Sequence, residues 1–144
     1  MFQHILVSVD GSEHSRQAVP VAIEIANRFD GDVFVLHVHE REVGRAAAYP
    51  IETPEDSHRI LADVLKTLQD AGVTARGEVQ QSVAGHVPKH IVETAQSQGS
   101  DLIIMGSRGL SNLAGLLLGS VTHKVIQLAH QPVLVARTPG AEKG

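Results

Sequence analysis

The sequence predicts a single α/β domain with an open, twisted, mostly parallel sheet that helices cover on both faces. Short apolar, β-branched runs alternate along the chain with segments whose apolar residues recur at helical spacing. A length of 144 residues suits one domain with a sizeable core. That core is aliphatic, because the chain has one Tyr and no Trp.

The predicted strands are five short apolar runs, at residues 5–9, 33–38, 73–83, 101–105 and 132–136. The predicted helices have apolar residues at helical spacing, at residues 15–29, 60–71, 87–95 and 121–129. This alternation indicates parallel strands joined by crossover helices, with both faces of the sheet buried.

Turn and helix-capping residues follow the first strand, as Asp10-Gly11-Ser12. In the next segment Pro20 interrupts the helical spacing, so the start of that helix stays open. Asp30-Gly31 is expected to end it. The connection from residue 40 to residue 54 is long for a compact domain, which is typical of a functional or mobile loop.

The third strand alternates polar residues, which is typical of an edge strand, and Pro88 can start the helix that follows it. His86 and His90 stand four apart, as metal ligands on one helix face do. Because Pro88 lies between them and no third ligand completes the set, exposed histidines are favoured over a zinc site.

The most informative segment lies between the fourth strand and the last helix. Gly106, Gly109 and Gly119 follow the spacing Gly-x2-Gly-x9-Gly-Ser, which ends at Ser120. Glycines let backbone N–H groups approach oxygens closely, and a helix N-terminus adds unpaired donors and a positive dipole end. This spacing after a buried strand predicts a phosphate-binding loop rather than simple helix capping, although Ser120 could serve as both cap and ligand.

Ligands of parallel sheets bind at the carboxyl ends of the strands, where the strand order reverses. Asp10, Val38 and Gly106 stand at the ends of the first, second and fourth strands, and they converge if the first and fourth strands are neighbours. Asp10 is also common turn chemistry, so a turn role and a ligand role both stay open.

With these residues in place, the chain resembles the universal stress protein family, specifically its ATP-binding branch. The resemblance covers residues 5–137 and includes Val7-Ser8-Val9-Asp10-Gly11-Ser12, His37-Val38 and the ungapped glycine pattern. It implies a Rossmann-like sheet with strand order 3-2-1-4-5 and a homodimer formed through the C-terminal strand.

The resemblance also implies roles for individual residues. The backbone at Val38 would hold adenine, and Asp10 would lie near the ribose or reach the phosphates through a metal ion. The expected cofactor is ATP or another adenine nucleotide with Mg²⁺ or Mn²⁺, and Asp10 is the expected metal ligand. The expected nucleotide-binding residues are Ser8, Val9, Asp10, Val38, Met105, Gly106, Ser107, Arg108, Gly109, Gly119, Ser120, Val121 and Thr122.

Composition argues against several classes of partner and of functional site. The formal net charge of −4 argues against nucleic acid as a partner. The absence of Cys excludes disulfides, a thiolate nucleophile and cysteine metal sites. No signal peptide and no membrane-spanning apolar run is visible, so we expect a cytoplasmic protein. Residues 1–137 would form the domain and residues 138–144 a flexible tail.

The expected function is a nucleotide-dependent stress sensor or signalling module with an unknown partner. Efficient ATP hydrolysis is not expected, because no P-loop Lys precedes Ser120 and no second carboxylate is placed beside Asp10. Two alternatives stay open. One is an adenylate-transferring enzyme, although the chain has neither the Ser-Gly-Gly-x-Asp-Ser nor the His-x-Gly-His motif of such enzymes. The other is a dimerising module with a vestigial site.

Overall fold

The computed structural model describes residues 1–41, 52–107 and 118–137. Its five parallel strands stand in the order β3 (Ala75–Val83), β2 (Asp32–Arg41), β1 (His4–Val9), β4 (Leu102–Gly106) and β5 (Val133–Ala136). The helices are α1 (Glu13–Arg16), α2 (Ala18–Phe29), α3 (Pro54–Asp70), α4 (Val87–Ser97) and α5 (Ser120–Leu128). The fold class and the strand order 3-2-1-4-5 are thereby confirmed.

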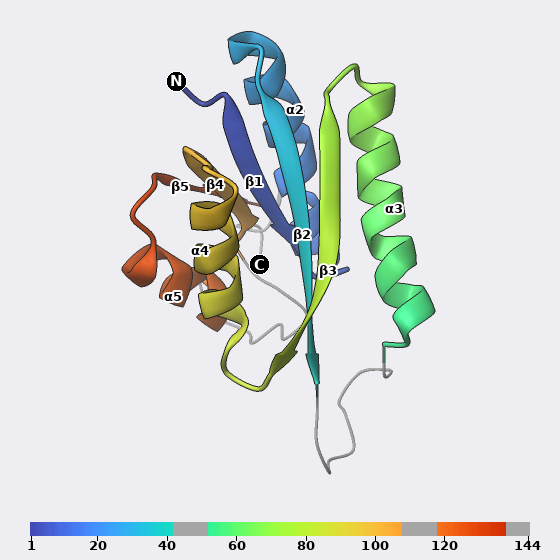
Figure 1. Ribbon diagram of the computed structural model, residues 1–144, viewed down its shortest axis with the longest axis vertical. Coiled ribbons are helices and arrows are strands. Elements are labelled where there is room, and N and C mark those ends of the chain that lie inside the picture. The colour runs from blue at the N-terminus through green and yellow to red at the C-terminus, as the bar shows by residue number, and fades with distance from the viewer. Residues whose placement is uncertain (42–51, 108–117, 138–144) are drawn as a thin grey trace, which may run out of the picture.

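Successive strand residues point to opposite faces of the sheet, and each face has its own core. Ile5, Val7 and Val9 of β1 pack with α2 and α3 on one face. On the other face, Leu6 of β1 packs with apolar residues of β2 and β4 and with α4 and α5. Figure 1 shows these two helical layers on either side of the sheet. The expectation of helices on both faces is confirmed.

The helical segment predicted over residues 15–29, whose start the sequence leaves open at Pro20, is divided into two helices in the structure. Two helices, α1 and α2, take its place and meet at Gln17. Pro20 has no N–H to donate to the carbonyl of Arg16, four residues earlier, so the helical ladder is interrupted there. The predicted end is correct, because Asp30 adopts a left-handed conformation with φ 54° and closes α2 with a bond to the Ala26 carbonyl.

The connection predicted from residue 40 to residue 54 is shorter in the structure, because β2 continues to Arg41 and α3 begins at Pro54. Thr53 Oγ1 accepts a hydrogen bond from Asp56 N at 3.1 Å, and Asp56 Oδ2 accepts one from Thr53 N at 3.0 Å. This capping box, together with Pro54 at the first helical position, starts α3 six residues before its apolar spacing becomes visible.

Strand β1 occupies the centre of the sheet, and its two neighbours, β2 and β4, lie far from each other in the sequence. β2 follows it directly, whereas β4 lies near the C-terminus. Asp101, just before β4, accepts hydrogen bonds from Gln3 N and His4 N with its two carboxylate oxygens. These bonds fix β4 beside β1 at the amino edge of the sheet.

Candidate functional site

The turn between β1 and α1 is closed by its own hydrogen bonds. Asp10 Oδ1 accepts from Ser12 N at 2.9 Å, and Ser12 Oγ accepts from Ser15 N at 3.1 Å. Ser15 Oγ accepts from Asp10 N at 3.1 Å and donates to the Ser12 carbonyl at 3.1 Å. The turn role of Asp10 is therefore confirmed, while its role toward a ribose or a metal ion stays a prediction.

Three of the predicted residues share one face of the sheet. Val38 and Met105 belong to the core under α4 and α5, and Ser8 lies on the same face because it is two residues from Leu6. Ser8 also stands opposite Met105 in the β1–β4 register. Val9 differs, because its side chain is buried with α2 and α3. Only the backbone of Val9 is then placed to line a site shared with the other three.

Packing against α1 requires glycine at position 106, a reason that the sequence interpretation missed. A Cβ atom at this position would lie 2.2 Å from the carbonyl oxygen of His14 and 2.8 Å from the Cα atom of Ser15. The backbone of α1 therefore packs directly against the end of β4, and only glycine permits that approach. Gly106 thus holds the β1–α1 turn beside the end of β4, whatever it does toward a ligand.

Two hydrogen bonds fasten the start of α5 to the end of β4. Gly119 N donates to the Ser107 carbonyl at 2.7 Å. The buried hydroxyl of Thr122 donates to the Gly106 carbonyl at 2.9 Å. Four predicted residues from two separate segments therefore meet at the carboxyl edge of the sheet. The Thr122 hydroxyl proton is already used in this contact, which leaves its backbone N–H for a ligand.

The first turn of α5 receives no side-chain cap within the described residues. Gly119 is its N-cap, with φ −70° and ψ 160°, and has no side chain to offer. No acidic residue stands in the first turn. Among the described residues, no side chain therefore caps the N–H groups of Ser120, Val121 and Thr122, which form a positive helix end beside β4. Arg108 and Gly109, which complete the predicted loop, lie outside the described residues.

A polar network near the carboxyl ends of β1 and β2 was not expected from the sequence. His37 is 1% exposed, and its Nδ1 lies 2.9 Å from the Val9 carbonyl oxygen. Its Nε2 lies 2.6 Å from Glu52 Oε2, which also accepts a hydrogen bond from Ser57 Oγ. A histidine inside an otherwise apolar strand was the available signal, but the sequence interpretation used it only as part of a family motif.

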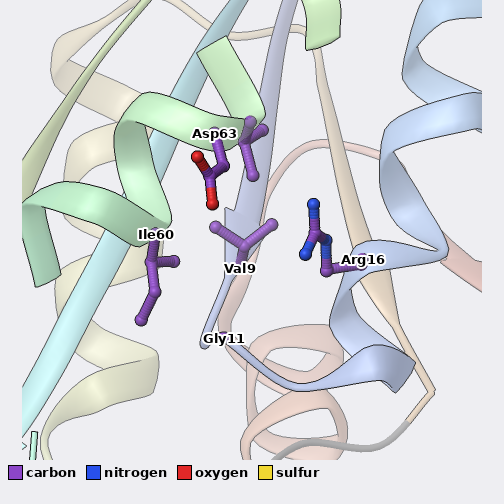
Figure 2. Close-up of a pocket in the computed structure, with 6 residues that line it drawn as sticks. Val9, Gly11, Arg16, Ile60 and Asp63 are labelled. Carbon is purple, nitrogen blue, oxygen red and sulfur yellow. The ribbon is translucent and has the colours of Figure 1, made fainter. Parts of the chain in front are cut away.

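A small pocket lies between α1 and α3, on the face of the sheet opposite Val38 and Met105 (Figure 2). Its lining residues are Val9, Gly11, Arg16, Ile60, Asp63 and Val64. Its volume is about 40 Å³, roughly that of one water molecule and far below the several hundred Å³ of typical ligand pockets. Of the residues predicted to bind a nucleotide, Val9 lines this pocket, but the pocket is too small for a nucleotide.

Within the described residues, no group of three or more His, Asp or Glu side chains is arranged to hold a metal ion. His90 Nδ1 instead bonds to the Gln80 side-chain oxygen at 2.8 Å, and His86 stands at the N-cap of α4. None of the helices in this part of the chain is both long and apolar enough to cross a bilayer.

Comparison with known proteins extends these observations. The sequence model described as "Universal stress protein family" matches residues 1–137. Universal stress protein MJ0531 of Methanocaldococcus jannaschii is 34% identical, over 99% of this chain and 86% of its own length. Among solved structures, that of the M. jannaschii protein MJ0577 covers 98% of this chain and 99% of its own, with a TM-score of 0.81 and 26% identity.

A second solved structure is a universal stress protein in complex with cAMP. It has a TM-score of 0.70 and 29% identity, and it covers 95% of this chain and 98% of its own.

Proposed function

The chain belongs to the universal stress protein family, and we propose that it binds an adenine nucleotide, ATP first, at the carboxyl edge of its sheet. In this proposal it acts in the cytoplasm as a nucleotide-dependent sensor or signalling module of the stress response. Bound nucleotide would change the surface that the protein offers to a partner.

One observation carries the proposal: the N-terminus of α5, which no described side chain caps, is fastened beside the end of β4. Free backbone N–H groups and a positive dipole end form a ready-made site for phosphate oxygens. The N–H groups here are those of Ser120, Val121 and Thr122, which follow Gly119 at the end of the Gly-x2-Gly-x9-Gly-Ser pattern, because the N–H of Gly119 itself donates to the Ser107 carbonyl. We assign the phosphates to this helix end.

The adenosine end would lie along the neighbouring strand ends. Ser8, Val38 and Met105 come from three adjacent strands and share one face. We propose that backbone groups at Val38 hold the adenine and that Asp10 lies near the ribose. The complex of a relative with cAMP supports an adenine nucleotide as the ligand class.

The proposal also covers metal-ion binding and ATP hydrolysis. Mg²⁺ and Mn²⁺ prefer carboxylate and phosphate oxygens, and Asp10 is the carboxylate at this edge that we assign to the ion, together with the nucleotide. We therefore propose that metal binds only with nucleotide and that any ATP hydrolysis is slow. If turnover approached the usual enzyme median of about 10 s⁻¹, the protein would instead be an ATP-hydrolysing enzyme.

The decisive experiment combines two measurements on the purified protein. Denaturing it and analysing the supernatant by mass spectrometry should release an adenine nucleotide. Calorimetry should show ATP binding by the wild type and none by Gly119→Val, whose side chain would block the phosphates. The backbone angles of Gly119 are open to Val, so the variant should fold. Unchanged ATP affinity in folded Gly119→Val would sink the assignment, and a wild type that binds no nucleotide would favour the vestigial module.

We also propose a homodimer through the outer edge of β5, where the apolar Val133, Leu134 and Val135 are half-buried. Ile103 N of β4 donates to the Pro132 carbonyl, and Ser107 N, just after β4, donates to the Ala136 carbonyl. Because alternate residues point to opposite sides, the backbone of Val135 points outward. Val135→Pro should therefore convert a dimer to a monomer in light scattering, whereas Val135→Thr, which keeps the N–H, should not. A monomeric wild type at micromolar concentration contradicts this.

A further inference from the structure

The buried network of His37, Glu52 and Ser57 is not used by the proposed function, and it joins three separate segments. His37 belongs to β2, its Nδ1 contacts the last residue of β1, and its Nε2 contacts Glu52, just before the N-cap of α3. Ser57 of α3 is buried and bonds to the same Glu52 oxygen. Polar groups as deeply buried as His37 persist when they are satisfied, and both of its ring nitrogens have a partner here.

The partners of His37 determine where its protons are. The Val9 carbonyl can only accept, so Nδ1 carries a hydrogen. Nε2 and Glu52 Oε2 lie 2.6 Å apart, a distance at which two bare acceptors would repel each other. One proton must therefore lie between them. The imidazole is held at both nitrogens, and its ring orientation is fixed by the carboxylate behind it.

This fixed ring touches both strand ends that frame the adenosine end of the site. It holds the carbonyl of Val9, the residue directly before Asp10. His37 is also the residue directly before Val38 on β2. Val9 and His37 stand opposite each other in the β1–β2 register, so one side chain fixes the two backbones relative to each other.

We propose that His37 and Glu52 are positioning residues for the adenosine part of the bound nucleotide, an inference that rests on the proposed function. They set the spacing and orientation of the β1 and β2 ends from behind, without touching the ligand. The start of α5, which we assign to the phosphates, is fastened independently through Gly106 and Ser107. The adenosine end and the phosphate end then have separate supports.

The test compares Glu52→Ala with Glu52→Gln by calorimetry with ATP and with AMP. Glu52→Ala leaves the buried Nε2 without a partner, so the ring loses its fixed orientation. The dissociation constants of ATP and AMP should both rise about tenfold. In Glu52→Gln the amide can donate to a neutral Nε2, while Nδ1–H still donates to Val9. That variant should bind both ligands within about threefold of the wild type.

His37→Leu provides a second variant, which removes the bond to Val9 and fills the space with an apolar side chain. It should weaken ATP and AMP by the same factor as each other. The ¹⁵N signals of the His37 ring should show that Nδ1 keeps its hydrogen in Glu52→Gln.

The outcomes separate this inference from the function on which it rests. A wild type that binds neither nucleotide refutes the function itself. If the wild type binds but folded Glu52→Ala binds equally well, even with a lower melting temperature, then His37 and Glu52 are merely structural and the inference falls. An effect that grows with the number of phosphates would also overturn it, because it would place the network at the phosphate end.

Discussion

Helices α3 and α5 both begin at the carboxyl edge of the same sheet, yet their first turns are completed in opposite ways. α3 satisfies its own N-terminus, since Thr53 and Asp56 exchange hydrogen bonds and Asp56 places a carboxylate at the positive helix end. α5 has Gly119 as its N-cap, and in the part of the chain that the structure describes it has no side-chain cap and no acidic residue in its first turn. Only the second arrangement leaves donors and positive potential for an external anion.

Helix α4 is intermediate between α3 and α5. Its N-cap His86 makes no side-chain capping bond, so α4 also lacks a cap. However, Pro88 stands in its first turn and removes one of the N–H groups that a ligand would need. An uncapped helix alone is therefore a weak sign of a ligand site. The combination of glycine, available N–H groups and attachment to the end of β4 is what distinguishes α5.

The largest expected effect comes from giving α5 the kind of start that α3 has. In Gly119→Asp the new carboxylate would cap the first turn and repel phosphate, so ATP affinity should fall at least about a hundredfold. Gly119→Asn provides the matched control, because it is nearly the same size as Asp and can make the same cap without the charge, so it should lose less affinity than Gly119→Asp. Calorimetry with ATP measures both. Equal losses in the two variants would show that charge at this helix end is unimportant.

A smaller effect is expected from loosening the attachment of α5. Thr122→Val removes the hydroxyl that bonds to the Gly106 carbonyl, which leaves a buried acceptor unpaired. The free energy of unfolding should fall by about 1–3 kcal/mol, measured by urea denaturation. Thr122→Ser keeps the hydroxyl and should lose clearly less. If the two variants were equally stable, the methyl group rather than the hydrogen bond would matter at this position.

The smallest effect is expected at the capped helix. Thr53→Ala removes one half of the capping box and should cost about 1 kcal/mol of unfolding free energy, with no change in ATP affinity. Hydrogen bonds from the backbone and side chain of Thr53 lower the pKa of Asp56. The stabilising contribution of this carboxylate is therefore present above its ordinary pKa and is lost as pH falls through the lowered pKa.

Urea denaturation of the wild type and Thr53→Ala at neutral and acidic pH checks this expectation. The stability difference between them should shrink in acid. A difference that stayed constant down to low pH would assign the effect to Thr53 alone.

Much of the fold could be predicted because each strand and helix has its own periodicity. The apolar run of β4 and the Gly-Ser start of α5 each depend on a few neighbouring residues, so they are visible in the sequence. The start of α3 was predicted too late, because its capping box lies in a polar stretch where apolar spacing gives no signal. The interruption between α1 and α2 was visible only as an ambiguity at Pro20.

The candidate site was harder to predict, because its geometry depends on residues far apart in the sequence. The glycine pattern pointed correctly to the place where β4 and α5 meet. It did not reveal that Gly106 accommodates the backbone of α1 at His14. Nor did it reveal that His37, Glu52 and Val9 form one buried network. Close backbone approaches and buried polar contacts arise from tertiary packing, which no local pattern records.

The central position of β1 has a consequence for how the chain is made. Asp101, which bonds to the backbone of His4, is synthesised 97 residues after it. At a translation rate of roughly 5–20 residues per second, this interval lasts roughly 5–20 s. During that time β1 can pair with β2, but the other edge of β1 has no partner until β4 is made. The growing chain therefore exposes an apolar strand edge on the ribosome until its C-terminal third emerges, and the half of the sheet that carries α5 is assembled last.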